Sequence, residues 1–286
     1  MVGGMKVFLN GQLVDEADAV ISVLDRGFLY GDGLFETLRV REGRPFRWAR
    51  HWARLAAGAA FLRMELPFAS AALLRAASEL ISANALADAV LRLTVSRGVG
   101  PRGYSPKGAG PLTVVMTLHA LPAAPNAGLS NWRLITSSFR LPANEPLAQF
   151  KTCNKLPQIL ARAEADAAGA DEALLGNTDG CLVEGASSNL FWIRDQQVCT
   201  PSLAGGILPG VTREAVLELC ASLRIPVCQT DIRGGDLRRV DGVFVSLSTL
   251  GIVPAESLDG GLLNQSPLTR TLGAAYDRLL ANECQG

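Results

Sequence analysis

The sequence predicts a mixed α/β protein that folds as two domains. With 286 residues, of which 48% are hydrophobic, the chain is long enough to bury a full core and to divide once. Segments with strand-like alternation and segments with helical spacing of apolar residues follow one another in both halves. The stretch 121–128, LPAAPNAG, is rich in Pro, Ala and Gly. We therefore expect domains at 1–120 and 129–286 joined by this linker.

The first half contains strands and helices in alternation. Asn10-Gly11 is a strong turn signal and predicts a hairpin, and alternation over Glu36–Arg41 predicts a strand that turns at Glu42-Gly43. Two stretches repeat apolar residues at helical spacing. The predicted elements are strands at Lys6–Asn10, Gln12–Val14 and Glu36–Arg41, an extended Pro45–Trp48, helices at Ala49–Arg63 and Ser70–Ala83, and strands at Ala89–Ser96 and Leu112–Leu118.

The second half begins with a strand at Trp132–Thr136 and continues with a lysine on an extended segment. A helix follows, with Asn154 as its expected cap and Pro157 in its first turn. Two short strands come next, and Glu184 ends the second. The remaining predicted elements are the loop Gly205–Gly210, a helix at Thr212–Leu223, strands at Val227–Asp231 and Val243–Ser246, and a helix at Leu268–Asn282. This mixed order suggests a cleft between two α/β domains.

Composition argues against several classes of protein. The formal net charge is zero, so no basic footprint suggests nucleic acid. No run of eighteen apolar residues and no signal-like start is present, so a cytoplasmic location is expected. The six cysteines are scattered without a CxxC pair, and His51 and His119 are isolated. We expect reduced thiols and no metal site.

Lys151 is the leading candidate for a chemical role. The chain has only four lysines against 23 arginines, and one of the four immediately precedes the predicted helix. A lysine amine can lose its proton and form a Schiff base, which a guanidinium cannot. Lys155 is the rival, but four residues later it is better explained as a solvated charge on a helix face.

Five motifs in order carry a family resemblance: RGFLYGDGLFETLRV, SRGVGPRGYS, FKTCNKL, CLVEGASSNLFW and GILPGVTRE. Together they resemble the class IV, fold-type IV pyridoxal-phosphate enzymes, and the resemblance covers nearly the whole chain. This family includes branched-chain and D-amino acid aminotransferases and 4-amino-4-deoxychorismate lyases. The resemblance implies a smaller N-terminal α/β domain, a larger C-terminal domain and a pyridoxal 5'-phosphate cleft between them.

The resemblance also implies cofactor contacts. Lys151, the first lysine of K-x-x-N, would form the Schiff base, and Glu184 would keep the pyridine nitrogen protonated. The glycine-rich loop before Thr212 ends at a helix N-terminus, which by itself favours an anion. By resemblance, the phosphate and the rest of the cofactor would be bound by Arg54, Ser188, Asn189, Val211, Thr212, Ser248 and Thr249.

Other residues would serve the substrate. Thr37 would act with Lys151 and Glu184 as a catalytic residue. Arg102 and Tyr104 lie in a glycine- and proline-rich loop suited to binding a carboxylate. The substrate residues would be Tyr30, Phe35, Arg102, Tyr104 and Asn144. The resemblance further implies a homodimer in which the Arg102 loop reaches the partner's site.

Three branches of the family compete for the reaction. D-amino acid enzymes usually carry a histidine where this chain has Tyr104, and branched-chain enzymes usually carry a glycine where it has Thr37. The Arg-Gly-Tyr-Ser run, Asn144 and Thr37 most resemble aminodeoxychorismate lyases, which release pyruvate and 4-aminobenzoate. A transaminase acting on D-amino acids, branched-chain amino acids or (R)-amines is the alternative, and a non-catalytic cofactor-binding protein is disfavoured because Lys151 is present.

Overall fold

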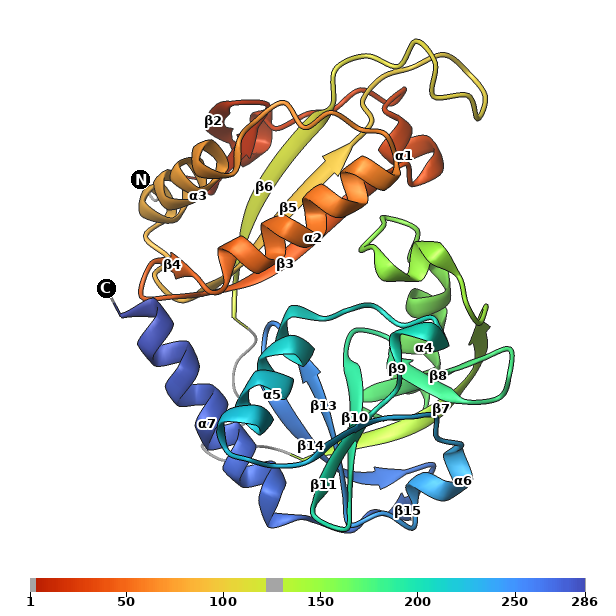
Figure 1. Ribbon diagram of the computed structural model, residues 1–286. Helices are drawn as coiled ribbons and strands as arrows, with labels where there is room; N and C mark the ends of the chain where they lie inside the picture. The colour runs from red at the N-terminus through yellow and green to blue at the C-terminus, as the bar shows by residue number, and fades with distance from the viewer. Residues whose placement is uncertain (1–3, 122–130, 286) are drawn as a thin grey trace. The chain divides into compact units, whose positions relative to one another are not determined.

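The structure is a computed structural model that describes residues 4–121 and 131–285. These residues form two compact units (Figure 1). The first unit takes 4–121, 150–154 and 280–285, and the second takes 131–149 and 155–279. Two segments predicted in the second domain, 150–154 and 280–285, thus belong to the first unit. The linker predicted at 121–128 lies outside the described residues, apart from Leu121, and stays a prediction.

The first unit is built on an antiparallel sheet of order β2-β1-β6-β5-β3-β4. The hairpin expected at Asn10-Gly11 forms its edge. The remaining strands pair in long registers, with β5 between β3 and β6. The strands are β1 (Lys6–Leu9), β2 (Gln12–Asp15), β3 (Gly33–Arg41), β4 (Arg44–Pro45), β5 (Ala89–Ser96) and β6 (Thr113–Ala120).

Helices α2 (Trp48–Phe61) and α3 (Ser70–Asn84) cover one face of this sheet (Figure 1). Alternate residues of the strands, such as Leu38 on β3 and Leu91 on β5, point into a shared apolar core with them. The other residues of these strands, including Phe35 and Thr37, therefore lie on the opposite face.

A short helix, α1 (Arg26–Tyr30), precedes β3 in a stretch where no helix or strand was predicted. The Asp25 carboxylate accepts a hydrogen bond from the Gly27 N–H at 2.7 Å and caps the helix. Gly31 ends it in the left-handed conformation, with φ of 67°. The helix has only five residues, too few to produce a helical repeat in the sequence. A second short element of this unit is the 3-10 helix η1 (Glu16–Asp18).

Residues 150–154 join the first unit because they pair with β3. Leu34 and Thr152 form an isolated antiparallel bridge. The Phe150 ring packs on Phe61 of α2, with ring centroids 4.6 Å apart. The last residues of the chain join the same unit, where Cys284 Sγ lies 3.8 Å from the Arg44 carbonyl.

The second unit is built on a mixed sheet of order β12-β11-β10-β13-β14-β7-β8-β9. Because β9 also pairs with β10, the strands from β10 to β9 close into a ring. The strands are β7 (Trp132–Leu141), β8 (Glu172–Asn177), β9 (Leu182–Gly185), β10 (Asn189–Arg194), β11 (Gln197–Thr200), β12 (Val227–Gln229), β13 (Gly242–Leu247), β14 (Gly251–Leu258) and β15 (Gly261–Leu262), which pairs with β14.

Apolar side chains fill both faces of this sheet. On β8, Leu174 belongs to one core cluster with Trp192, and its neighbour Leu175 belongs to another with Ala161 of α4. Strands buried on both faces read as continuous apolar runs. The helices of the remaining chain are α4 (Leu156–Ala167), α5 (Val211–Ser222), α6 (Gly234–Leu237), α7 (Pro267–Cys284) and the 3-10 helices η2 (Pro146–Gln149) and η3 (Leu203–Gly205).

Two expectations for the second half need correction. Asn154 does not cap α4: Lys155 occupies the N-cap position, and the Asn154 amide donates to the Gly31 carbonyl at 3.1 Å instead. Pro157 does lie in the first turn, as predicted. Strands β10, β11 and β14 were not predicted, because short apolar runs show no clear period and Pro254 disfavours a strand.

Candidate active site

Lys151 lies on the extended segment that pairs with β3. The Phe35 N–H donates to the Lys151 carbonyl at 2.9 Å, and the Cys153 N–H donates to the Gly33 carbonyl at 2.9 Å. These hydrogen bonds fix the backbone on both sides of Lys151. The Lys151 amine lies 4.6 Å from the centre of the Phe35 ring. The structure thus brings together two of the predicted site residues.

The face of the sheet that carries Phe35 also carries Thr37 and an arginine that was not predicted. Arg92 on β5 is the register partner of Thr37. Its guanidinium carbon lies 3.9 Å from the centre of the Phe35 ring, and its Nε donates to the Thr94 hydroxyl at 3.3 Å. Within the described residues Arg92 forms no ion pair, and burial lowers its pKa. A cation so placed suits an anionic group near Lys151.

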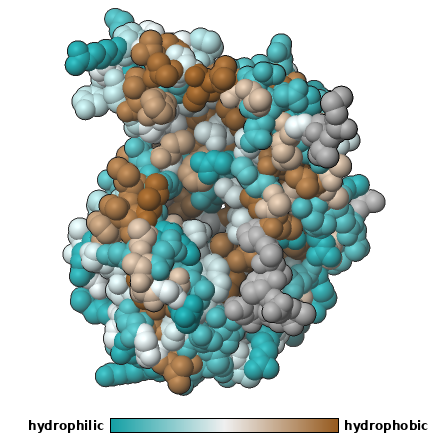
Figure 2. Space-filling model, turned by 180° about the vertical axis from the view of Figure 1, so that it is seen from behind, coloured by the Kyte–Doolittle hydropathy of each residue, from teal (hydrophilic) through white to brown (hydrophobic). Residues whose placement is uncertain are grey.

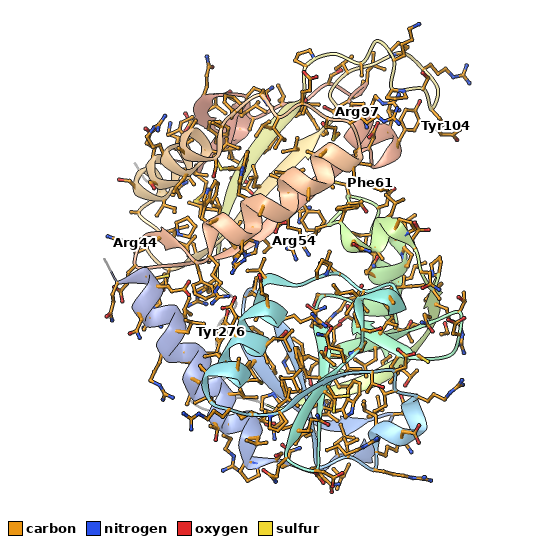
Figure 3. All side chains as sticks on the ribbon, in the orientation of Figure 1. Arg44, Arg54, Phe61, Arg97, Tyr104 and Tyr276 are labelled. Carbon is orange, nitrogen blue, oxygen red and sulfur yellow. The ribbon has the colours of Figure 1, made fainter. Side chains whose placement is uncertain are left out.

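Arg54, which projects from α2, is held by a buried carboxylate of β3 (Figure 3). Its Nε donates to Glu36 Oε1 at 2.8 Å and its Nη2 to Glu36 Oε2 at 2.6 Å. His51 Nδ1, one turn earlier on α2, lies 2.7 Å from the same Oε2. This bidentate pair fixes the plane of the guanidinium.

The Glu36–His51–Arg54 cluster has defined protonation states. Burial opposes ionisation of Glu36, but the charge and hydrogen bonds of Arg54, together with His51, lower its pKa to about 2. Burial lowers the pKa of His51 and outweighs the carboxylate beside it. His51 is therefore neutral at neutral pH. Since an ionised carboxylate only accepts, His51 Nδ1 carries the proton.

In the second unit, α5 begins with an uncapped turn of backbone N–H groups. Gly210 is the N-cap residue and has no side chain to cap the helix. A Cβ on Gly210 would lie 1.9 Å from Asn189 Oδ1, so any larger residue there would displace the Asn189 side chain. Val211 and Thr212 follow and are buried. Their N–H groups and the Thr212 hydroxyl are donors of the kind that bind phosphate.

Glu184 and Asn189 both hold the loop that leads to α5. Glu184 Oε2 accepts from the Leu208 N–H at 2.9 Å, and Asn189 Nδ2 donates to the Leu208 carbonyl at 2.9 Å. The two residues are register partners on β9 and β10. Two separate sequence motifs, CLVEGASSNLFW and GILPGVTRE, thus meet at Leu208.

Glu172 supports the turn between β9 and β10 and was missed from the sequence. Its side chain is fully buried, and its Oε2 accepts from the hydroxyls of Ser187 at 2.8 Å and Ser188 at 3.0 Å. The Ser187 N–H donates to the same oxygen at 3.1 Å. The Ser188 hydroxyl, predicted to bind the cofactor, therefore has an internal acceptor. A glutamate at the start of an apolar strand was the only available signal.

Ser248 and Thr249 lie in the turn between β13 and β14 and are half-buried. On β13, Ser246 is the register partner of Asn189 and is 1% exposed. The Ser246 hydroxyl has no hydrogen-bond partner among the described residues. An unpaired buried hydroxyl beside Asn189 is the kind of group that a bound polar ligand satisfies.

The loop that carries Arg102 and Tyr104 leaves both side chains exposed, and Tyr104 is 88% exposed. The Tyr30 hydroxyl accepts from the Gly103 N–H at 3.1 Å, and the Tyr30 and Tyr104 rings are 5.6 Å apart. The structure thus places Tyr30 against the loop that carries Arg102 and Tyr104.

Asn144 is an exposed residue of the second unit in the left-handed conformation, with φ of 57°. It precedes the 3-10 helix η2. A Cβ on Gly206 would lie 3.8 Å from the Asn144 N atom, so its backbone borders the loop before α5. The role of Asn144 in substrate binding stays a prediction.

Comparisons with known proteins agree with this geometry. A model of the amino-transferase class IV family matches residues 33–258. A putative branched-chain-amino-acid aminotransferase of Methanocaldococcus jannaschii is 37% identical over 91% of this chain and 90% of its own. A D-alanine aminotransferase of Bacillus licheniformis is 30% identical over 98% of both. The solved 4-amino-4-deoxychorismate lyase of Pseudomonas aeruginosa is 36% identical, with a TM-score of 0.84 over 95% of this chain and 98% of that one.

This chain belongs to the class IV aminotransferase family. The resemblance drawn from the five motifs is confirmed, and so are the mixed α/β fold and the assignment as an enzyme. Three activities occur among the relatives of this class IV enzyme: branched-chain aminotransferase, D-alanine aminotransferase and 4-amino-4-deoxychorismate lyase.

Other expectations for this class IV enzyme concern its location, the roles of its site residues and its cysteines. No helix in residues 4–121 and 131–285 is long and apolar enough to cross a membrane. The cytoplasmic location and the roles of the individual site residues stay predictions. No disulfide joins cysteines within the residues that the structure describes.

Proposed function

We propose that this class IV enzyme uses pyridoxal 5'-phosphate. Three observations support the fit of the residues to this group: the amine of Lys151 beside an aromatic ring, the uncapped start of α5, and the unpaired buried hydroxyl of Ser246. When bound, the cofactor supplies an aldehyde that takes up an amine and a ring that withdraws electrons from the adjoining carbon.

In the first unit, Lys151 would bind the cofactor aldehyde and move the proton at the carbon that bears the substrate amine. Arg54 would pair with the phosphate, and Glu36 and His51 would hold its guanidinium in place. Thr37, on the face of Phe35, would orient the substrate.

In the second unit, Glu184 would hold a proton on the ring nitrogen of the cofactor. The Val211 and Thr212 N–H groups and the Thr212 hydroxyl would donate to the phosphate. The Ser248–Thr249 turn would supply further hydroxyl donors. Ser188 and Asn189 would keep the Glu184 turn and the Leu208 loop in register.

For the reaction, we propose 4-amino-4-deoxychorismate lyase. Arg92 carries this choice, since it lies 3.9 Å from the Phe35 ring that Lys151 also contacts. The lyase substrate has two carboxylates, and the first unit offers two cations, Arg92 and Arg102, in addition to the proposed phosphate ligand Arg54. Alanine and branched-chain amino acids have one carboxylate and require only one such partner.

A transaminase is the second candidate. Two aminotransferase relatives, 37% and 30% identical to this chain, support this candidate. The two reactions would share removal of a proton by Lys151. In a lyase the C–O bond to the enolpyruvyl group would then break, and that group would take up a proton and leave as pyruvate. In a transaminase no such bond would break, and Lys151 would return the proton on the cofactor side of the amine nitrogen.

One pair of assays separates the candidates. Release of 4-aminobenzoate and pyruvate from aminodeoxychorismate is compared with pyruvate formation from D-alanine plus an α-keto acid, and with turnover of branched-chain amino acids. We expect the first without the others. Turnover of D-alanine or a branched-chain amino acid without 4-aminobenzoate would instead establish a transaminase.

We propose that the working form is a homodimer. Hydrophobic residues reach the surface in several patches (Figure 2). In the first unit, Val20 is 75%, Val23 71% and Phe28 69% exposed. Burial of such side chains by a second copy would be favourable. Light scattering of the purified protein tests this, and replacing Val23 and Phe28 by Ser should shift the mass toward the monomer.

A further inference from the structure

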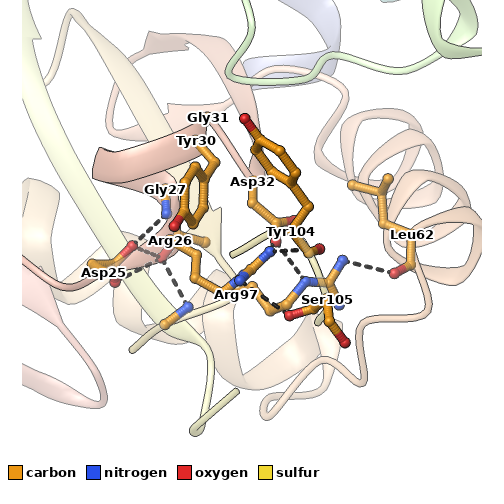
Figure 4. Close-up of polar contacts among 12 residues, drawn as sticks. Asp25, Arg26, Gly27, Tyr30, Gly31, Asp32, Leu62, Arg97, Tyr104 and Ser105 are labelled. Atoms are coloured by element: carbon orange, nitrogen blue, oxygen red, sulfur yellow. Dashed lines mark hydrogen bonds and ion pairs between the residues drawn. The ribbon is translucent and has the colours of Figure 1, made fainter. Parts of the chain in front are cut away.

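Arg26, the first residue of the motif RGFLYGDGLFETLRV, is a buried arginine. Its guanidinium faces the loop that carries Arg102 and Tyr104. Its side chain is 3% exposed. Its Nη1 donates to the Gly103 carbonyl at 2.9 Å and to the Ser105 carbonyl at 3.2 Å, while Nη2 donates to the Tyr104 carbonyl at 3.2 Å (Figure 4). One guanidinium thus binds three successive carbonyls, a task for which its planar fork of donors is suited.

Asp32 fixes the other edge of the Arg26 guanidinium. Its Oδ2 accepts from Arg26 Nε at 2.8 Å and from Arg97 Nε at 2.8 Å (Figure 4). Burial opposes ionisation of Asp32, but the hydrogen bonds and charges of Arg97 and Arg26 lower its pKa. Arg97 in turn donates to the Leu62 carbonyl at 2.9 Å, which ties the network to the end of α2.

The loop conformation depends on this network. Gly103 has a φ of 107°, which residues other than glycine rarely adopt, and this turn lets successive carbonyls converge on one side. A Cβ on Gly100 would lie 3.0 Å from Arg26 Cδ, so the loop also packs against the Arg26 stem. With its carbonyls turned inward, the loop exposes the side chains of Arg102 and Tyr104.

We propose that Arg26 is a positioning residue: it fixes the backbone of 103–105 so that Arg102 and Tyr104 form a pre-organised clamp for a substrate carboxylate. The proposal rests on the proposed role of Arg102 and adds the group that prepares it. Arg26 would act through this loop and not by direct contact, because its guanidinium nitrogens already bind Asp32 and the loop carbonyls. A rigid clamp binds more tightly than a mobile one because less conformational entropy is lost on binding.

Arg26→Met and Arg26→Lys test the inference through backbone order. Amide hydrogen exchange of 102–106 measures local opening without any reference to activity. We expect Arg26→Met to speed exchange there by about tenfold or more, and Arg26→Lys to lie between it and the unaltered enzyme, because an ammonium lacks the planar fork. Arg213→Met is the matched control, since Arg213 is also buried and donates to the Pro201 carbonyl in the second unit.

Steady-state kinetics of the holoenzyme then test whether the backbone order of 102–106 affects binding of the amino substrate. We expect Arg26→Met to raise KM for the amino substrate by about tenfold, to change kcat by less than about threefold, and to leave the cofactor dissociation constant unchanged. Unchanged exchange at 102–106, an equal change in Arg213→Met, or a fall in kcat with constant KM would each overturn the inference.

Two further variants keep the test decisive. If Arg26→Met does not fold, Tyr30→Phe removes only the hydroxyl that accepts the Gly103 N–H. That variant should speed exchange of the Gly103 amide, and no change there would count against the network. Arg102→Met separates the two proposals. A raised KM in Arg102→Met but not in Arg26→Met refutes the positioning role alone, whereas an unchanged KM in Arg102→Met refutes the clamp itself and the inference with it.

Discussion

The two units prepare their candidate residues by different means. In the first unit, carboxylates hold cationic side chains: the buried Glu36 fixes Arg54, and the half-buried Asp32 fixes Arg26 and Arg97. Each of these arrangements is an ion pair whose members come from different elements. Loss of one partner leaves an uncompensated charge in a poorly solvated place.

In the second unit, buried side chains hold backbone groups instead. Glu184 and Asn189 bind the two polar groups of Leu208, and Glu172 binds the serine turn. The donors prepared in this way are N–H groups at the start of α5. The comparison teaches that the first unit should be sensitive to charge, whereas the second should be sensitive to backbone geometry and glycine.

Lys151→Ala should have the largest effect of all, because no backbone group of either unit replaces an amine that moves a proton. We expect turnover to fall by a factor on the order of 10²–10⁴ or more. Product formation at saturating cofactor measures this, and Lys155→Ala is the control that should stay active. Borohydride reduction followed by peptide mapping should label Lys151; a label on Lys155 alone would refute the assignment.

Glu36→Ala and Glu172→Ala compare the two units directly. Removing Glu36 leaves the poorly exposed Arg54 charge without its carboxylate partner. We therefore expect the unfolding free energy to fall by about 3–5 kcal/mol and the cofactor to bind more weakly. Removing Glu172 leaves neutral donors unpaired, for which about 1–3 kcal/mol is expected. Urea unfolding and hydrogen exchange resolved by unit give both values. Equal losses would show that charge does not distinguish the units.

Much of the fold was predictable because local patterns carried it. β5 was placed at Ala89–Ser96 and the hairpin at Asn10-Gly11 because period and turn chemistry are local signals. The ring of strands in the second unit was not predictable. It depends on pairings such as β7 with β14, which join residues more than a hundred positions apart. The sequence of neither strand contains a signal for its partner.

Site residues were predictable only where they belong to a family motif. Lys151 and Glu184 came from family motifs, and the structure adds the contacts that hold them. Glu36, Glu172 and Arg26 were missed as supports because each acts through another residue. A buried carboxylate beneath an arginine has no spacing rule, since its partner comes from a different element.

Gly210→Ala should break the backbone arrangement of the second unit without touching charge. Its Cβ would lie 1.9 Å from Asn189 Oδ1, so the Asn189–Leu208 hydrogen bond must shift. We expect about a tenfold loss of cofactor affinity, corresponding to about 1.4 kcal/mol, and no change in hydrogen exchange over β3 and α2. Gly205→Ala is the control, because its nearest atom would be Val183 Cγ1 at an ordinary 3.5 Å. Similar losses in both variants would argue against the role of Gly210.

The smallest expected effect is a pH dependence that begins below pH 6.5 in the first unit. The pKa of His51 is lowered in the folded chain, so below its ordinary value of about 6.5 the unfolded chain binds the extra proton and stability falls. The pKa of Glu36 is lowered from 4.5 to about 2, so its contribution is complete above pH 4.5 and is lost as the pH falls toward 2. Acid should therefore weaken this unit in two steps, each with a slope of at most about 1.4 kcal/mol per pH unit for one proton.

His51→Gln separates these two steps, because glutamine cannot titrate while Glu36 still can. Protection factors of β3 and α2 peptides, measured from pH 7.5 to 4, should decline below pH 6.5 in the unaltered enzyme and stay level down to about pH 4.5 in the variant. Peptides of β8 and β10 provide the internal control. Their residues do not include the cluster, and Glu172 there binds hydroxyl and N–H groups instead of a histidine. A decline below pH 6.5 that persists in His51→Gln, or that is as large in β8 and β10, would mean that the first unit owes no special charge sensitivity to this cluster.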